Sequence, residues 1–79
     1  MTASTARDLV EASRRIDSDV NGNPRYYIPR FLFPPMTTKT RRAAGLMTYR
    51  GKRYGAGVVV QSYSLERDLQ FALNIIAEG

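Results

Sequence analysis

The residues best suited to chemistry lie in one short run, Tyr49-Arg50-Gly51-Lys52-Arg53-Tyr54. Three cationic side chains stand close together there, and a tyrosine flanks them on each side. Guanidinium and ammonium groups bind phosphate or carboxylate oxygens, and tyrosine rings can stack on nucleic-acid bases. The run therefore predicts a contact surface for an anionic partner, with Arg50, Lys52 and Arg53 as the main contacts and Tyr49 and Tyr54 beside them. The alternative is solvated charge that keeps a strand edge from aggregating.

A second basic cluster, Lys39, Arg41 and Arg42, precedes the first along the chain. We assign these three residues to the same binding surface, provided that the fold brings both clusters to one side of a sheet. The alternative for this second cluster is a disordered basic loop without a partner.

Charge is distributed unevenly along the 79 residues. Residues 20–65 contain eight Lys and Arg residues and no Asp or Glu, whereas residues 1–19 and 66–79 each have a small net negative charge. A region with one sign of charge attracts an anionic partner and raises its association rate. Most of the basic residues are arginine, whose planar fork of donors suits phosphate or carboxylate, although a GC-rich genome would produce the same bias.

Cys, His and Trp are absent, which excludes several classes of protein. No disulfide can form, no thiolate or imidazole can bind zinc, and neither a Ser–His–Asp triad nor a Cys–His pair is possible. Nucleotide-binding glycines open a helix, whereas Gly55 and Gly57 precede a valine run typical of a strand, so we interpret them as a bulge or a close backbone approach. The seven carboxylates form no acid–base pair. We therefore expect a protein without enzymatic activity, metal or cofactor.

Helical periodicity marks two segments that could hold the basic clusters in place. Residues 5–17 are expected to form a helix that begins at Thr5 and buries a narrow apolar stripe. A second helix begins at Ser64, carries acidic residues in its first two turns, and has the wider stripe expected of the main core helix. The two stripes consist of Ala6, Leu9, Val10, Ser13 and Ile16, and of Leu65, Leu69, Ala72, Leu73 and Ile76, the second widened by Phe71 and Ile75.

Residues 25–33 are expected to form the first strand, after the turn Asn21-Gly22-Asn23-Pro24. Pro29 has no amide to donate to a neighbouring strand, which indicates an edge position or a bulge. The aromatic side chains of this strand favour core and strand packing over base stacking. They are Tyr26, Tyr27, Phe31 and Phe33.

Residues 46–50 and 53–61 are expected to form a hairpin whose two-residue turn is Gly51-Lys52. This register places like charges opposite each other beside the turn and a stabilising aromatic pair one step further out. The opposed pairs are Arg50 with Arg53 and Tyr49 with Tyr54. Residues 36–44 fit either a loop or one helical turn begun by a threonine cap.

The sequence thus predicts an α+β fold in the order helix–strand–strand–strand–helix, with the helices packed on one face of an antiparallel sheet. We expect a single small domain over residues 1–79, in which the acid-free middle, residues 20–65, lies between the two amphipathic helices. This order resembles the layout of the double-stranded-RNA-binding domain. That domain carries lysines at the start of its last helix, where this chain has the acidic run Ser64-Leu65-Glu66-Arg67-Asp68, so the resemblance implies the layout only.

Two segments, Val20 to Tyr26 and Tyr49 to Tyr63, resemble segments of small phage and prophage proteins. The resemblance implies a short accessory protein of a mobile element. Such proteins commonly bind host machinery, and anti-CRISPR and other anti-defence inhibitors belong to the same class.

Two functions stay open on this evidence. The first is a non-catalytic basic protein that binds a nucleic acid or a host nucleoprotein complex, and the second is an inhibitor that contacts a host nuclease complex. The start of the sequence has no apolar signal segment, and no apolar run is long enough to cross a membrane. We therefore expect a cytoplasmic protein, in the host cytoplasm if a phage encodes it. Nothing in the sequence indicates a homo-oligomer.

Overall fold

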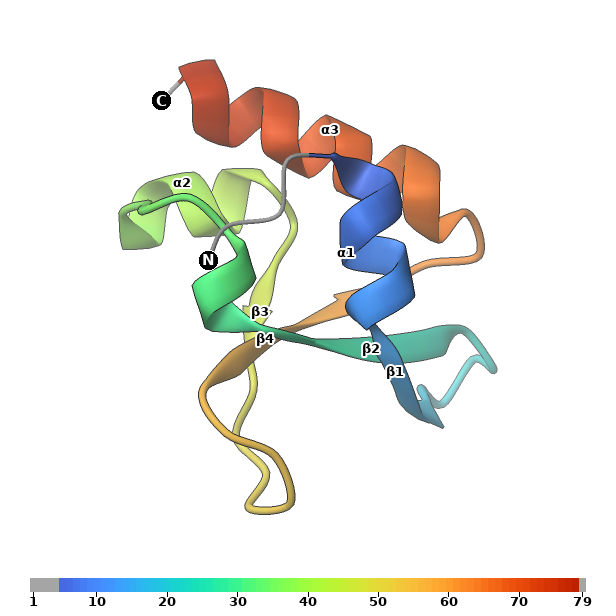
Figure 1. Cartoon of the computed structure of the whole chain (residues 1–79). Helices are drawn as coiled ribbons and strands as arrows, with labels where there is room; N and C mark the ends of the chain where they lie inside the picture. Colours follow the sequence, from blue (N-terminus) through green and yellow to red (C-terminus); the bar gives the residue numbers. More distant parts are fainter. Residues whose placement is uncertain (1–4, 79) are drawn as a thin grey trace.

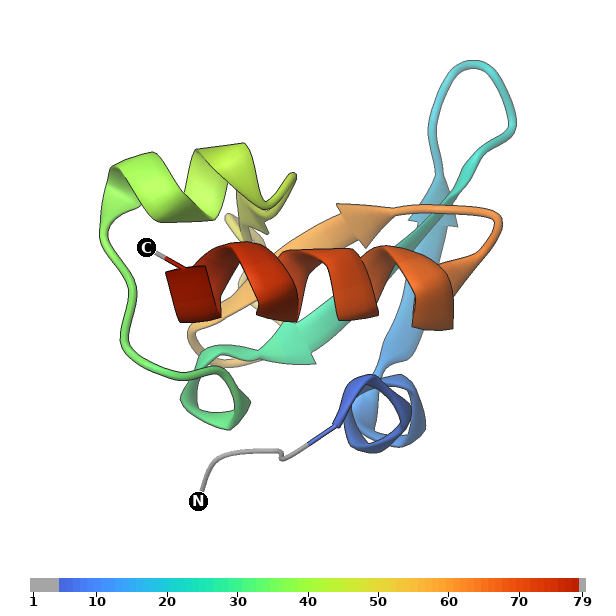
Figure 2. The same cartoon turned by 90° about the horizontal axis from the view of Figure 1, so that it is seen from above.

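The computed structural model describes residues 5–78 and shows three helices on one face of a four-stranded sheet (Figures 1 and 2). The strands lie in the order β1-β2-β4-β3, and every neighbouring pair is antiparallel. The α+β class and the helix-covered face are confirmed, while residues 1–4 and 79 of the expected domain lie outside the described residues. In chain order the elements are α1 (Ala6–Ala12), β1 (Arg14–Ser18), β2 (Pro24–Pro29), the 3₁₀ turn η1 (Arg30–Leu32), α2 (Thr38–Ala43), β3 (Met47–Thr48), β4 (Gly57–Gln61) and α3 (Leu65–Glu78).

The first helix is shorter than predicted, because α1 ends at Ala12 and the rest of the expected helix forms strand β1. Thr5 caps α1 as expected, since its hydroxyl accepts the Asp8 amide at 3.2 Å. Ser13 then ends the helix: its backbone is extended, and its amide and hydroxyl both donate to the Val10 carbonyl, at 3.1 and 2.6 Å. The prediction of one helix over residues 5–17 is therefore wrong. Ile16 fits the helical spacing of the apolar residues, but pairing with β2 outweighs this local preference.

The predicted turn around Asn21 connects β1 to β2, and the Asp19 carboxylate organises it. Asp19 Oδ1 accepts the amides of Asn21 and Asn23 at 2.9 and 2.8 Å, and Gly22 adopts a φ of +84°. Although partial desolvation opposes the shift, hydrogen bonds from Asn23 and Asn21 and the charge of Arg25 hold the pKa of Asp19 below its ordinary value.

Strand β2 ends at Pro29, four residues earlier than predicted, and it lies inside the sheet rather than at its edge. Pro29 is the last residue of the strand, and the chain then turns through η1. Phe33 is buried in the core as expected, whereas Phe31 is 64% exposed, which corrects its assignment to packing. The strand period fails here because the 3₁₀ turn changes the direction in which these side chains point.

Residues 36–44, which fitted a loop or a helical turn, form helix α2. The Thr37 hydroxyl accepts the Thr40 amide at 3.2 Å and caps the helix. Gly45, with a φ of +76°, follows the helix and turns the chain toward β3. Helix α2 therefore presents its arginines from a defined position.

The predicted hairpin is present, but its register is wrong and its turn is longer. Only Met47–Thr48 pairs with β4, opposite Val59 and Val58, and residues 49–56 form the connecting loop. Arg50 and Arg53 are therefore not a cross-strand pair, and Gly51-Lys52 is not a two-residue turn. The ladder stops because tyrosine side chains, described below, hold the loop against the sheet.

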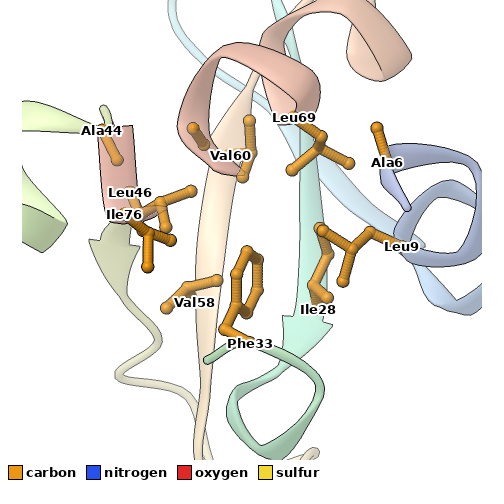
Figure 3. Packing of buried hydrophobic residues seen from close by; sticks show 11 residues of the cluster. Ala6, Leu9, Ile28, Phe33, Ala44, Leu46, Val58, Val60, Leu69 and Ile76 are labelled. Carbon is orange, nitrogen blue, oxygen red and sulfur yellow. The ribbon is translucent and has the colours of Figure 1, made fainter. Parts of the chain in front are cut away.

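The hydrophobic core fills the space between the sheet and the helices (Figure 3). Leu9 of α1, Ile28 of β2 and Leu69 of α3 are fully buried, and Val58 and Leu46 are nearly so. As predicted, α3 supplies the largest share of helical core residues, but Phe71, which was expected to widen its apolar stripe, is 55% exposed. Because alternate strand residues point to opposite faces, the neighbours of Ile28 and Val58 lie on the face that carries no helix.

Candidate anion-binding groove

Three tyrosines hold the basic loop, residues 49–56, on the helix-free face of the sheet. The Tyr27 ring of β2 stacks on the Tyr54 ring at a centroid distance of 4.7 Å and meets the Tyr49 ring edge-on at 4.8 Å. The Tyr27 hydroxyl donates to the Gly55 carbonyl at 3.0 Å. Gly57 lets the Tyr27 ring lie against the backbone, since an added Cβ would collide with that ring and stand 2.7 Å from the Ile28 carbonyl oxygen. The close approach predicted for the Gly55–Gly57 segment is thus made by Tyr27 and Ile28.

Beside this tyrosine cluster lies a groove of about 700 Å³, which we call the arginine groove. Helix α2 contributes one wall, the start of the basic loop contributes another, and the sheet supplies apolar residues such as Val59 as well as charged ones. Figure 1 shows α2 and the loop at the β3 side of the sheet. The groove extends from there across the sheet to residues of β1 at the opposite edge. Its charged lining residues are Asp17, Arg25, Arg41, Arg42 and Arg50.

The arginines of the groove differ in how many contacts they already make within the protein. Arg41 donates from Nη1 to the Leu46 carbonyl at 2.7 Å, so it also holds the turn between α2 and β3. Arg25 Nε stands 3.5 Å from Asp17 Oδ1. Arg42 and Arg50 are exposed, and neither forms an ion pair with any described residue. These two side chains are therefore the cations most available to a partner.

The structure brings only part of the predicted surface together. Tyr49, Arg41, Arg42 and Arg50 line one groove although more than one element carries them. Arg53 and Tyr54 line a smaller pocket of about 240 Å³ beside it, which also includes Arg15, and the Arg53 guanidinium lies 5.9 Å from the Tyr54 ring centroid. Lys52 at the loop and Lys39 on α2 are exposed and line neither of these two pockets.

Sequence reasoning missed Asp17, Arg25 and Tyr27 as parts of this region. Asp17 was placed at the end of a helix, and it reaches the groove only because β1 pairs Asp17 with Arg25. Tyr27 was assigned to strand packing, which is correct, but its partners come from the distant basic loop. The alternation of Tyr27 with the buried Ile28 was the available signal for an aromatic residue on the second face.

The part of the chain that the structure describes contains no group of three or more His, Cys, Asp or Glu residues able to hold a metal ion. Among residues 5–78, no helix is long and apolar enough to cross a membrane. The groove can bind an anion, because arginines of β2, of α2 and of the basic loop line it together.

Comparison with protein families places the chain among phage proteins. One family model, described as Staphylococcus phage terminal repeat-encoded protein TreK, matches residues 4–78. Comparisons with curated proteins and with solved structures give no significant match. The match spans nearly all of the sequence and confirms the phage resemblance at the level of a small phage protein family. The chain therefore belongs to the family of the Staphylococcus phage terminal repeat-encoded protein TreK.

Proposed function

We propose that this chain is a non-catalytic phage protein that binds nucleic acid through its phosphate groups. The observation that carries the proposal is the convergence of Arg41 and Arg42 from α2 with Arg50 from the basic loop on one groove. Guanidinium groups on two walls can each contact a phosphate of the same strand, and such contacts release counterions from the nucleic acid. Phage origin is consistent with action in the host cytoplasm.

The surrounding charge supports this proposal. Within residues 5–78, every ion pair between side chains involves Arg7, Arg25 or Arg67, so the cations of α2 and of the basic loop have no acidic partner there. The net positive charge of the groove and the loop would steer a polyanion to this face.

The tyrosines support contact with the backbone rather than with bases. Tyr27 is buried between Tyr49 and Tyr54, so one face of the Tyr54 ring is already used for packing. Phosphate contacts carry no sequence information. We therefore expect tight binding at low salt, a steep salt dependence and little preference among sequences.

Fluorescence anisotropy with labelled 20-nucleotide single strands and duplexes tests the proposal. The double variant Arg42→Gln/Arg50→Gln should bind at least tenfold more weakly at 50 mM salt, and its log–log salt slope should fall by about 0.7–0.9 for each lost phosphate contact. Arg7→Gln/Arg67→Gln is the matched control, because it removes two exposed cations, one of α1 and one of α3, that lie outside the groove. No binding by the parent protein, or an equal loss in the control, would contradict the proposal.

A second candidate is an inhibitor that contacts a host nuclease complex, and membership of a phage family favours it. The same cations would then face carboxylates of a protein, where salt dependence is weaker and loss of a buried pair mainly speeds dissociation. Pull-down from a host lysate with and without nuclease treatment distinguishes the two. A specific protein retained after nuclease treatment, and lost with the Arg42→Gln/Arg50→Gln variant, would favour the inhibitor.

A further inference from the structure

The arginine groove contains one feature that opposes anion binding. Asp17 is the sole carboxylate among the described residues that line it, and it faces Arg25 across the β1–β2 ladder. The pairing is not an optimal one: Nε and Oδ1 are 3.5 Å apart, whereas charge-assisted hydrogen bonds of this type are about 2.7–2.9 Å long. Arg25 therefore retains capacity to bind another anion.

The Arg25 guanidinium supports this view independently. Its Nε atom is buried, and within residues 5–78 it has no hydrogen-bond partner, because the Asp17 contact lacks the required geometry. A buried donor without an acceptor is costly and calls for a physical explanation. A phosphate in the groove could accept from the guanidinium group, because about one third of the Arg25 side chain is exposed although its Nε atom is not.

A bulge in β1 explains how Asp17 reaches the groove. The β1–β2 register shifts between Arg15 and Asp17, so one extra residue is present in β1. Neighbouring residues of a regular strand point to opposite faces, but Ile16 and Asp17 both line the arginine groove. Bulges re-aim side chains in this way beside binding sites. The Asp17 side chain is 52% exposed at the edge of the sheet, and it can rotate toward solvent without opening the core.

From these observations we infer that Asp17 is an internal competitor for the arginine groove, an inference that rests on the proposed function. In the free protein its carboxylate partly neutralises Arg25, and a bound phosphate takes its place. Asp17 thereby lowers the affinity of the groove for any anion that must displace it from Arg25. It is a competing residue rather than a ligand-binding residue.

The test compares Asp17→Asn with the parent protein by fluorescence anisotropy on a labelled 20-nucleotide strand across a salt series. Asp17→Asn should bind about three- to tenfold more tightly with an unchanged log–log salt slope, because the number of phosphate contacts stays the same while no carboxylate has to be displaced from Arg25. Glu11→Gln is the matched control for net charge, since Glu11 is an exposed acid of α1 outside the groove. The gain should vanish in the double variant Asp17→Asn/Arg25→Gln when it is compared with Arg25→Gln alone.

The outcomes separate the inference from the proposed function. Binding by the parent protein with no gain in Asp17→Asn, or with an equal gain in Glu11→Gln, overturns the inference alone. A loss of affinity in Asp17→Asn also overturns it, because Asp17 would then position Arg25 rather than compete for it. No binding by the parent protein or any variant overturns the proposed function and the inference with it. Thermal unfolding of each variant confirms that the compared proteins are folded.

Discussion

The Tyr27 ring stacks on the Tyr54 ring, with an interplanar angle of 19°. Tyr27 belongs to an inner strand of the sheet, whereas Tyr54 lies in the basic loop beyond the end of β3. The stack therefore joins the element that carries Arg50, Lys52 and Arg53 to an inner strand of the sheet. Changes in this cluster should affect both stability and the position of the cations.

Tyr27→Leu should lower the free energy of unfolding by about 1–3 kcal/mol, because it removes a buried ring, two aromatic contacts and the hydrogen bond to Gly55. Urea unfolding measures the change. Tyr63→Leu is the control, since Tyr63 is 75% exposed and the same replacement should change stability by no more than about 0.5 kcal/mol. Equal effects of the two replacements would contradict the packing described for Tyr27.

Gly57→Ala should destabilise the fold by about 1–3 kcal/mol, because the new Cβ would meet the Tyr27 ring and the Ile28 backbone, and backbone cannot move aside cheaply. Gly55→Ala is the matched control, because it makes the same replacement two residues away. Its new Cβ would meet no atom within 4 Å. We expect Gly55→Ala to stay within about 0.5 kcal/mol of the parent in the same urea experiment. If Gly57→Ala is as stable as Gly55→Ala, Tyr27 does not lie against Gly57.

Arg41→Gln and Arg42→Gln should separate a structural arginine from a binding arginine. Arg41→Gln should cost about 0.5–2 kcal/mol of stability, because it removes the bond to the Leu46 carbonyl. Arg42 is exposed, so Arg42→Gln should leave the melting temperature unchanged while it weakens nucleic-acid binding. Thermal unfolding and anisotropy on both variants provide the check, and a stability loss confined to Arg42→Gln would refute the assignment.

The turn at Asp19 should make stability depend on pH in the acid range. Because the folded state lowers the pKa of Asp19, its charged form stabilises the protein above the ordinary aspartate pKa of about 3.9, and this contribution is lost as pH falls through the lowered value. Asp19→Asn keeps acceptors for the Asn21 and Asn23 amides but has no charge. It should be less stable than the parent at pH 7 and approach it as the pH falls through the lowered pKa of Asp19. A constant difference across a series of urea unfolding curves would exclude this role.

The sequence by itself determined the elements whose signals are local. Thr5 and Thr37 cap helices through short-range hydrogen bonds, Asn21 to Pro24 form a turn, and the apolar stripe of α3 requires burial wherever the helix packs. The acid-free composition around the loop and α2 likewise follows from the sequence, as does the expectation of an anionic partner. Capping, turn chemistry and hydrophobic periodicity depend on neighbours a few residues away, so they can be recognised in the sequence without knowledge of the fold.

Tertiary structure decided what depends on partners distant in the sequence. Ile16 continues the helical stripe of Leu9, yet residues 14–18 become a strand because β2 offers them a ladder. The segment after β3 forms a loop rather than a tight hairpin because its two tyrosines, Tyr49 and Tyr54, pack on Tyr27. Tyr27 belongs to β2, which lies two strands away from β3 in the sheet. The arginine groove arises in the same way, since the long-range pairing of β1 with β2 places Asp17 beside Arg25 and sheet packing brings both toward α2. Such contacts exist only in the folded chain. In the folded chain the energy of packing exceeds the preference of any one segment for helix or strand.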